Sequence, residues 1–185
     1  MRQTRYMKSV KELETKSFET MKGDFGYKNK LSAPRLVKVV VSVGTGKGIK
    51  NDKNFNTKVS DRIAKITGQK PAIRKAKKAI ASFKTRTGDP IGVVVTLRGK
   101  RMYDFLEKLL KVAFPRTKDF RGVNISGVDQ LGNMSLGIKE HTIFPEIKDE
   151  ELKDVFSLGV SIVTTAKGKK EAEEFFKLIG MPFVK

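Results

Sequence analysis

The stretch LVKVVVSV at residues 36–43 consists almost entirely of apolar and β-branched residues. A run of this kind predicts a β-strand with a central position in a sheet. Similar or alternating runs predict further strands at 71–74, 91–97, 134–138 and 155–165. Pro71 lacks a backbone N–H, which restricts the 71–74 strand to an edge of the sheet or places the proline among its first residues.

Helices are expected between these strands, because apolar residues recur at helical spacing in four segments, about 6–22, 54–67, 102–113 and 172–179. Gly68 occupies the position expected just after the second helix, and Pro115 is expected to end the third. Helices mixed with adjacent strands indicate an α+β fold. We therefore expect a mostly antiparallel sheet with helices packed on one face and the other face open.

The chain has 185 residues and a formal net charge of +19. This length predicts a single domain, residues 1–185, with its own core. Residues 1–100 contain 25 basic and 7 acidic side chains, a net of +18, whereas residues 101–185 contain 14 and 13, a net of +1. Because such an excess repels itself in a compact state, we expect a polyanionic partner, with nucleic acid ranked before an anionic membrane.

Several classes of function are disfavoured by composition. The chain has no cysteine and one histidine, His141, so disulfides, thiolate metal sites and histidine-based zinc sites are excluded, and no cofactor is expected. No nucleophile, base and orienting group come together, so we expect neither an enzyme nor a small-molecule substrate. No apolar run approaches the roughly 20 residues that span a bilayer, and no secretory signal is present, so the protein is expected to stay where it is made.

The glycine-rich turn at 43–48, VGTGKG, resembles a phosphate-binding loop without matching it. That motif requires glycine at position 41 and serine or threonine at position 48, where this chain has Val41 and Gly48. The turn is still suited to close approach of a phosphate to backbone N–H groups. The alternative is a turn that merely needs glycine for a positive φ.

Alternation along three strands predicts the composition of the open sheet face. Val37, Val39, Val41 and Val43 are expected to face the helices. The opposite face then carries small, hydroxyl and basic residues: Leu36, Lys38, Val40 and Ser42 in the first strand, Gly92, Val94, Thr96 and Arg98 in the second, and Asn133, Ser135, Gly137 and Lys139 in the third. These strands contain no aromatic residue, so we expect recognition of folded RNA through its backbone and shape rather than by base stacking. An ordinary solvated sheet face is the alternative.

Charge is densest between Asp61 and Asp89, where 27 consecutive residues contain no acid. The nine basic residues there are Arg62, Lys65, Lys70, Arg74, Lys75, Lys77, Lys78, Lys84 and Arg86. Residues 75–89 are expected to form a long loop or loose hairpin that binds phosphates, and a solvated flexible loop is the alternative. The acidic residues Asp149, Glu150, Glu151 and Asp154 are interpreted as a solvated helix face, with a metal or protein-docking site as the alternative.

Six ordered blocks of sequence resemble one known family. They are ITGQKP at 66–71, PIG at 90–92 with VTLRG at 95–99 and Arg101 and Met102, PR at 115–116 with DFRG at 119–122, FPEI at 144–147, TTAK at 164–167 and PF at 182–183. Together they closely resemble bacterial large-subunit ribosomal protein five, with an N-terminal family segment at about 31–88 and a C-terminal segment at about 89–183.

The resemblance implies a cytoplasmic ribosomal protein of the central protuberance that performs no chemistry. It implies contact with 5S rRNA through Lys38, Ser42, Gly44, Gln69, Lys70, Thr96 and Arg98. It implies that Arg74, Lys75, Lys77, Lys78, Lys84 and Arg86 face the P-site tRNA. It also implies an intersubunit bridge to small-subunit ribosomal protein thirteen around Asp119, Phe120, Arg121 and Gly122, and contacts with other central-protuberance components, with no membrane partner.

One position departs from the family pattern. Members of that family have Asn-Met-Gly-Val-Gly in the turn after the first strand, whereas this chain has Ser42-Val43-Gly44-Thr45-Gly46. A side-chain amide contact at this position is replaced by a hydroxyl that can donate one hydrogen bond. Judged on residues alone, a basic RNA chaperone or DNA-binding protein is the runner-up, and a small nucleotide-binding enzyme is the third possibility.

Overall fold

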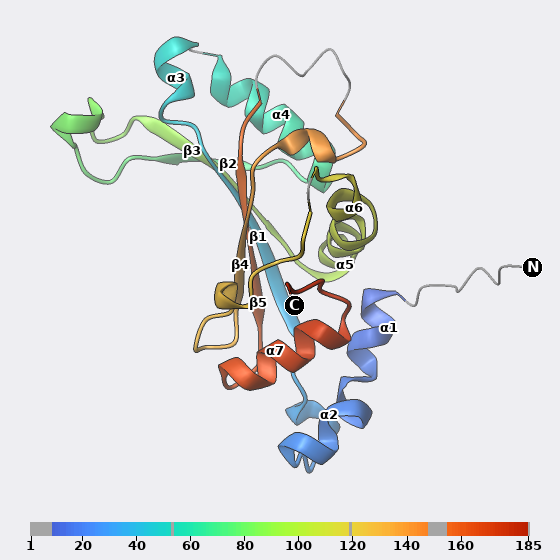
Figure 1. Ribbon diagram of the computed structural model, residues 1–185. Helices are drawn as coiled ribbons and strands as arrows, with labels where there is room; N and C mark the ends of the chain where they lie inside the picture. Colours follow the sequence, from blue (N-terminus) through green and yellow to red (C-terminus); the bar gives the residue numbers. More distant parts are fainter. Residues whose placement is uncertain (1–8, 53, 119, 148–154, 185) are drawn as a thin grey trace, which may run out of the picture.

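A computed structural model describes the chain except for residues 1–8, 53, 119, 148–154 and 185 (Figure 1). The acidic cluster at 149–154, Asp119 and the start of the first expected helix therefore lie outside the described residues. The helices are α1 Val10–Thr15, α2 Ser17–Phe25, α3 Gly48–Asn51, α4 Phe55–Thr67, α5 Gly99–Lys108, α6 Phe114–Arg116 and α7 Lys169–Leu178. The strands are β1 Leu36–Gly44, β2 Ala72–Lys75, β3 Pro90–Leu97, β4 Met134–Ile138 and β5 Leu158–Thr164.

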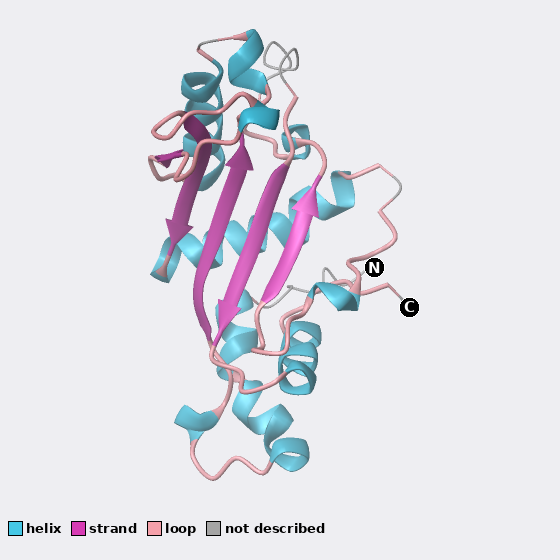
Figure 2. Cartoon of the chain, turned by 90° about the vertical axis from the view of Figure 1, so that its left-hand side faces the viewer, coloured by secondary structure: helices cyan, strands magenta, loops and turns pink. Residues whose placement is uncertain are grey.

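The five strands form one sheet in the order β2-β3-β1-β5-β4, and every neighbouring pair is antiparallel. The stretch at 36–43 is thus the central strand, and the proline-led segment is an edge strand, as the sequence predicts. Figure 2 shows the strands side by side with the helices behind them. The α+β fold with helices on one face and the other face open is confirmed.

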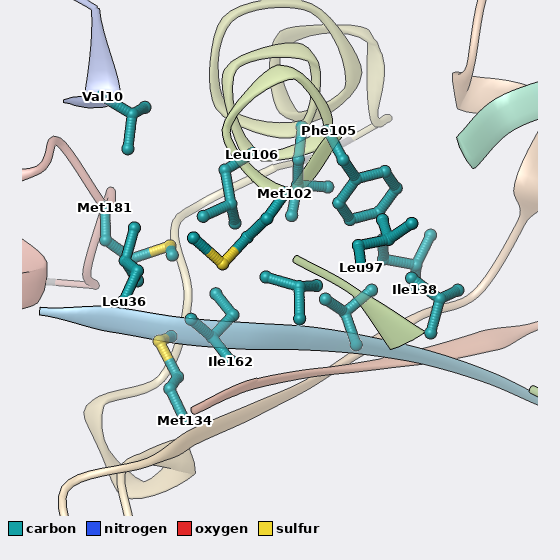
Figure 3. Packing of buried hydrophobic residues seen from close by; sticks show 14 of the residues in the cluster. Val10, Leu36, Leu97, Met102, Phe105, Leu106, Met134, Ile138, Ile162 and Met181 are labelled. Carbon is teal, nitrogen blue, oxygen red and sulfur yellow. The ribbon is translucent and has the colours of Figure 1, made fainter. Parts of the chain in front are cut away.

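The core lies between the sheet and its helical layer, where β1 and α5 face each other (Figure 3). Val39 of β1 is opposite Leu97 of β3 and Ile162 of β5, and all three side chains are buried. Met102, Phe105 and Leu106 of α5 pack onto this layer from above. Burying apolar surface on one side of the sheet leaves its other side free for a partner.

The N-terminal segment forms two helices rather than the single helix expected at 6–22. α1 begins at a capping box in which Ser9 and Glu12 bond each other's backbone N–H groups, and it ends at Thr15 with Lys16 as its C-cap. Glu107 of α5 accepts a 3.0 Å hydrogen bond from the N–H of Val10, and Tyr27, just after α2, donates to Glu171 of α7. These bonds attach the N-terminal helices to the helical layer.

The expected helix end at Pro115 is wrong by one residue, because α6 continues to Arg116. A π-helical segment, η3 Leu109–Ala113, precedes it, and the N–H of Phe114 bonds the carbonyl of Leu109. Pro115 lies in the first turn after this change of pitch, where a missing N–H has little cost.

The expected faces of Leu36 and Val37 are also reversed. Leu36 is buried, whereas Val37 is 40% exposed. The pairing of β1 with β5 shifts register between Leu36 and Lys38, and such an irregularity inverts the alternation for the residues before it. From Lys38 onward the predicted faces are correct.

Candidate RNA interface

The open face of the sheet is lined by small side chains in rows that cross its strands. Residues paired across antiparallel strands share a face, so the register defines these rows. One row runs through Gly137, Gly159, Ser42, Val94 and Ala72. The next runs through Ser135, Ser161, Val40 and Thr96.

Close contacts restrict two positions of the sheet to glycine. A Cβ added to Gly159 would lie 3.2 Å from the Ser42 hydroxyl oxygen, and one added to Gly92 would lie 3.3 Å from the Val43 carbonyl oxygen. The hydroxyl groups of Ser135 and Ser161 are 3.1 Å apart and hydrogen bonded. None of the five strands contains Phe, Tyr or Trp. A surface of small and hydroxyl-bearing side chains without aromatic rings suits a sugar–phosphate backbone rather than splayed bases.

The residues predicted to contact rRNA are spread along the length of the sheet. Lys38 and Ser42 lie on the open face of β1, and Gly44 ends that strand. Gly44 is paired with Gly92, at the opposite end of β3 from Thr96. Since Gly44 lies six positions after Lys38, the two are roughly 20 Å apart along the strand.

Gln69, Lys70, Thr96 and Arg98 come together where β3 leads into α5. The side-chain N–H of Gln69 donates a 3.1 Å hydrogen bond to the carbonyl of Thr96. The side-chain oxygen of Gln69 accepts a 3.4 Å hydrogen bond from the Arg101 guanidinium. Gln69 therefore ties the segment after α4 to the end of β3. Lys70 and Arg98 are both exposed beside it.

The glycine turn is ordered by packing rather than by unusual backbone angles. Gly44, Gly46 and Gly48 all lack a positive φ, so the alternative based on positive φ is wrong. Gly48 is needed for another reason, because a Cβ there would lie 2.3 Å from the Phe55 ring. The N–H of Thr45 already bonds the carbonyl of Ile91 at 2.9 Å. This turn thus holds α3 and α4 against the sheet.

The basic segment between β2 and β3 is a hairpin that extends away from the helical layer (Figure 1). At its neck, the N–H of Ala76 bonds the carbonyl of Asp89 at 2.8 Å, and that of Gly88 bonds the carbonyl of Ala76 at 3.0 Å. Four of the basic residues predicted to face tRNA lie in the hairpin beyond β2 and are exposed: Lys77, Lys78, Lys84 and Arg86.

Arg74 and Lys75 lie in β2 itself, outside that projecting part. Arg74 is paired with Gly92, which places it on the open face of the sheet. It borders both the predicted rRNA surface and the hairpin.

The segment containing Phe120, Arg121 and Gly122 is held by the C-terminal residues. Phe120 stacks on Phe114 with ring centroids 4.8 Å apart. The N–H of Val123 bonds the carbonyl of Pro182 at 2.6 Å. Gly122 has a φ of 115°, and a Cβ there would lie 2.8 Å from the backbone nitrogen of Val184. The 120–123 segment therefore has a defined position.

A groove of about 880 Å³ separates this segment from the edge strand β4. Its lining includes Phe114 and Phe120 on one side and residues 135–138 of β4 on the other. The basic residues among its described lining are Arg116, Lys118, Arg121 and Lys139. The sequence predicts the segment but not the groove, since only the fold brings residues 114–124 beside 135–143.

Sequence reasoning also missed the contribution of β5 to the open face. Gly159, Ser161 and Val163 alternate with the buried residues Leu158, Val160 and Ile162. The alternation of residues 158–163 in the sequence is the signal that identifies them.

Groups with clearly shifted pKa values lie largely in the helical layer, away from the open face. Burial raises the pKa of Glu14 above its ordinary value, although a hydrogen bond from Tyr103 opposes this. Burial and the Glu14 carboxylate together raise the pKa of Tyr103 to about 12. The described residues contain no cluster of three potential metal ligands and no helix with the length and apolar character needed to cross a membrane.

Two family models match the chain in succession. The family described as Ribosomal protein L5 matches residues 29–86, and the model of the C-terminus of that ribosomal family matches residues 90–183. A protein named Large ribosomal subunit protein uL5 from Desulforapulum autotrophicum is 50% identical over 178 residues, which cover 96% of this chain and 99% of that protein. A protein of the same name from Symbiobacterium thermophilum is 52% identical over a match that covers 86% of this chain and 88% of that protein. Another from Heliobacterium modesticaldum is 49% identical, and the match covers 96% of this chain and 98% of that protein.

Proposed function

The chain belongs to the ribosomal protein L5 family and is a structural constituent of the large ribosomal subunit, and from this premise we propose that the open face of its sheet binds 5S rRNA in the central protuberance. The family is structural rather than enzymatic, as the sequence predicts, and its members lie in the cytoplasmic ribosome.

The aromatic-free open face formed by all five strands, lined with small and hydroxyl-bearing residues, is the observation that supports this proposal most directly. Ser42, Ser135, Ser161 and Thr96 supply hydroxyl groups, while glycines leave room for close approach. Lys38 lies on this face, and Lys70 and Arg98 are exposed at its end. Hydroxyl and cationic donors on a surface of small side chains are suited to phosphate and ribose oxygens of a folded RNA.

Affinity measurements test this proposal. Full-length protein is titrated against 5S rRNA and against an RNA duplex of equal length at several salt concentrations. We expect 5S rRNA to bind more tightly at every concentration, because recognition by shape requires a particular folded RNA. Equal affinities would favour the basic RNA chaperone and refute the assignment.

The basic hairpin supports a second contact, with the P-site tRNA of the assembled ribosome. Its four exposed basic residues project beyond the sheet, so they can reach an RNA other than the one on the open face. Ribosomes carrying Lys77→Glu with Lys78→Glu should release P-site tRNA faster, while 5S rRNA binding by the protein stays nearly unchanged. If 5S rRNA binding is lost as well, the two surfaces do not act separately.

A third contact is proposed for the ordered segment at 120–122, in the near-neutral half of the chain, as the bridge to small-subunit ribosomal protein thirteen. The basic groove beside it suits an acidic or mixed protein surface better than a stacked base. Arg121→Glu should weaken subunit association at low magnesium without altering 5S rRNA affinity. Unchanged subunit association would remove this segment from the bridge.

A further inference from the structure

The tip of the basic hairpin carries apolar side chains that are not part of the core. Phe83 is 63% exposed and Ile80 is 46% exposed, although most of the chain's large apolar residues are buried. Phe83 lies between clusters of positive charge, with Lys77 and Lys78 before it and Lys84 and Arg86 after it. An exposed aromatic ring within such a segment suggests a partner with both a flat apolar surface and negative charge.

The tip is an ordered turn rather than a loose coil. Ile80 and Thr85 exchange two backbone hydrogen bonds of 3.1 and 3.2 Å, and they enclose the short 3-10 helix η2 Ala81–Phe83. The N–H of Lys84 bonds the carbonyl of Ala81 at 2.9 Å. Lys84 has a φ of 50°, and no other non-glycine residue in the described part of the chain has a positive φ. The turn thus fixes where the Phe83 backbone lies before any partner binds.

We propose that Phe83 is a stacking platform for an exposed nucleobase, and that Lys84 and Arg86 bind the phosphates beside that base. This inference rests on the proposed contact between the hairpin and tRNA. Every nucleobase offers a π-face to an aromatic ring, and neighbouring cations attract its backbone. The 27-residue stretch around the tip contains no acid, which favours a nucleic acid over a protein surface of mixed charge.

The two surfaces of the protein differ in the kind of RNA that they suit. The open sheet face has no aromatic residue and suits a helical RNA backbone. The hairpin tip carries one exposed ring and suits an unpaired or terminal base. A single ring contributes affinity without reading sequence, which is appropriate for a contact that must accept many different tRNAs.

Ribosomes assembled with full-length variants test the stacking contact through the dissociation rate of P-site tRNA. Phe83→Ala should increase this rate by about 5- to 150-fold, the range that corresponds to loss of one aromatic–base stack. Phe83→Trp should remain close to the wild type, because it keeps a flat π-system. Phe83→Leu should behave like Phe83→Ala, because it keeps apolar bulk without a ring. Leu131→Ala removes a residue that is 74% exposed elsewhere and should have no effect.

Chemical probing of tRNA bases provides the second readout. One base should be protected in wild-type and Phe83→Trp ribosomes and become reactive in Phe83→Leu ribosomes. If Phe83→Leu retains the wild-type rate and protection, the contact is not stacking. A photo-crosslinker at position 83 that attaches only to protein would also overturn the proposal, in favour of a protein partner.

The lysine variants separate this inference from the proposed function. If Lys77→Glu with Lys78→Glu speeds tRNA release while Phe83→Ala does not, the hairpin contacts tRNA but the stacking platform is wrong. If neither variant changes the rate, the tRNA contact itself is wrong.

Discussion

Replacing Lys38 and Arg98 by glutamine should lower the slope of log affinity against log salt for 5S rRNA binding, by the contribution of about two phosphate contacts. Lys38 lies on the open face of β1, and Arg98 is exposed directly after β3. Each phosphate contact contributes about 0.9 to the slope of log affinity against log salt. Raising salt from about 50 to 200 mM therefore weakens each contact about 3.5-fold, and two contacts about 12-fold. The affinity difference between wild type and variant should shrink by this factor of about 12 across the same range.

The assay is fluorescence anisotropy of labelled 5S rRNA titrated with full-length protein at four or more salt concentrations. Lys77→Gln with Lys78→Gln is the matched control, because it removes two positive charges from the hairpin instead of the sheet. The control should leave the slope for 5S rRNA unchanged. Equal loss of slope in both double variants would mean that total charge matters and not its location, which would refute the assignment of 5S rRNA to the open face.

Three further predictions concern other parts of the fold. Gly137→Val adds bulk to the open face at a position where an added Cβ has no atom within 4 Å, so the melting temperature should be kept while 5S rRNA affinity falls about tenfold. Unchanged affinity would exclude RNA from the row of the open face that contains Gly137. Because burial raises the pKa of Glu14 above 4.5, the native state binds this proton more tightly than the unfolded state, and the unfolding free energy from urea titration should fall as pH rises from about 4.5 to neutral. Glu14→Gln should lack this pH-dependent fall, and parallel pH profiles of the two proteins would contradict the account. Leu106→Ala, at a fully buried site, should lower the unfolding free energy by about 2–5 kcal/mol without altering the RNA affinity of the folded protein. A smaller loss of unfolding free energy would mean that α5 is not tightly packed on β1.

The strands and the composition of the open face could be predicted because a β-strand alternates its side chains between two faces. Val39, Val41 and Val43 are buried and Ser42 is exposed, as the period of two requires. The same rule failed at Leu36 and Val37, where a register shift inverts the alternation. Pairing with a neighbouring strand creates this shift, so the local sequence does not contain it.

The hairpin illustrates a different limit. The absence of acid from 62–88 predicts a cationic loop, since charge is a property of composition. Its internal order depends on hydrogen bonds between Ala76 and Asp89 and between Ile80 and Thr85, which require the two arms to meet. The segment expected to be a long loop or loose hairpin therefore forms a turn with a defined exposed ring.

The sequence by itself determined the fold class, the uneven distribution of charge and the lack of enzymatic groups, because each follows from periodicity or composition. Only the tertiary structure decided which residues share a surface. Gly137, Gly159 and Ser42 form one row because three strands distant in sequence pair in a particular register. Likewise, the backbone around Pro182 and Val184 holds the 120–123 segment beside β4. Such neighbours are set by the packing of the whole sheet and its helices, which no single segment specifies.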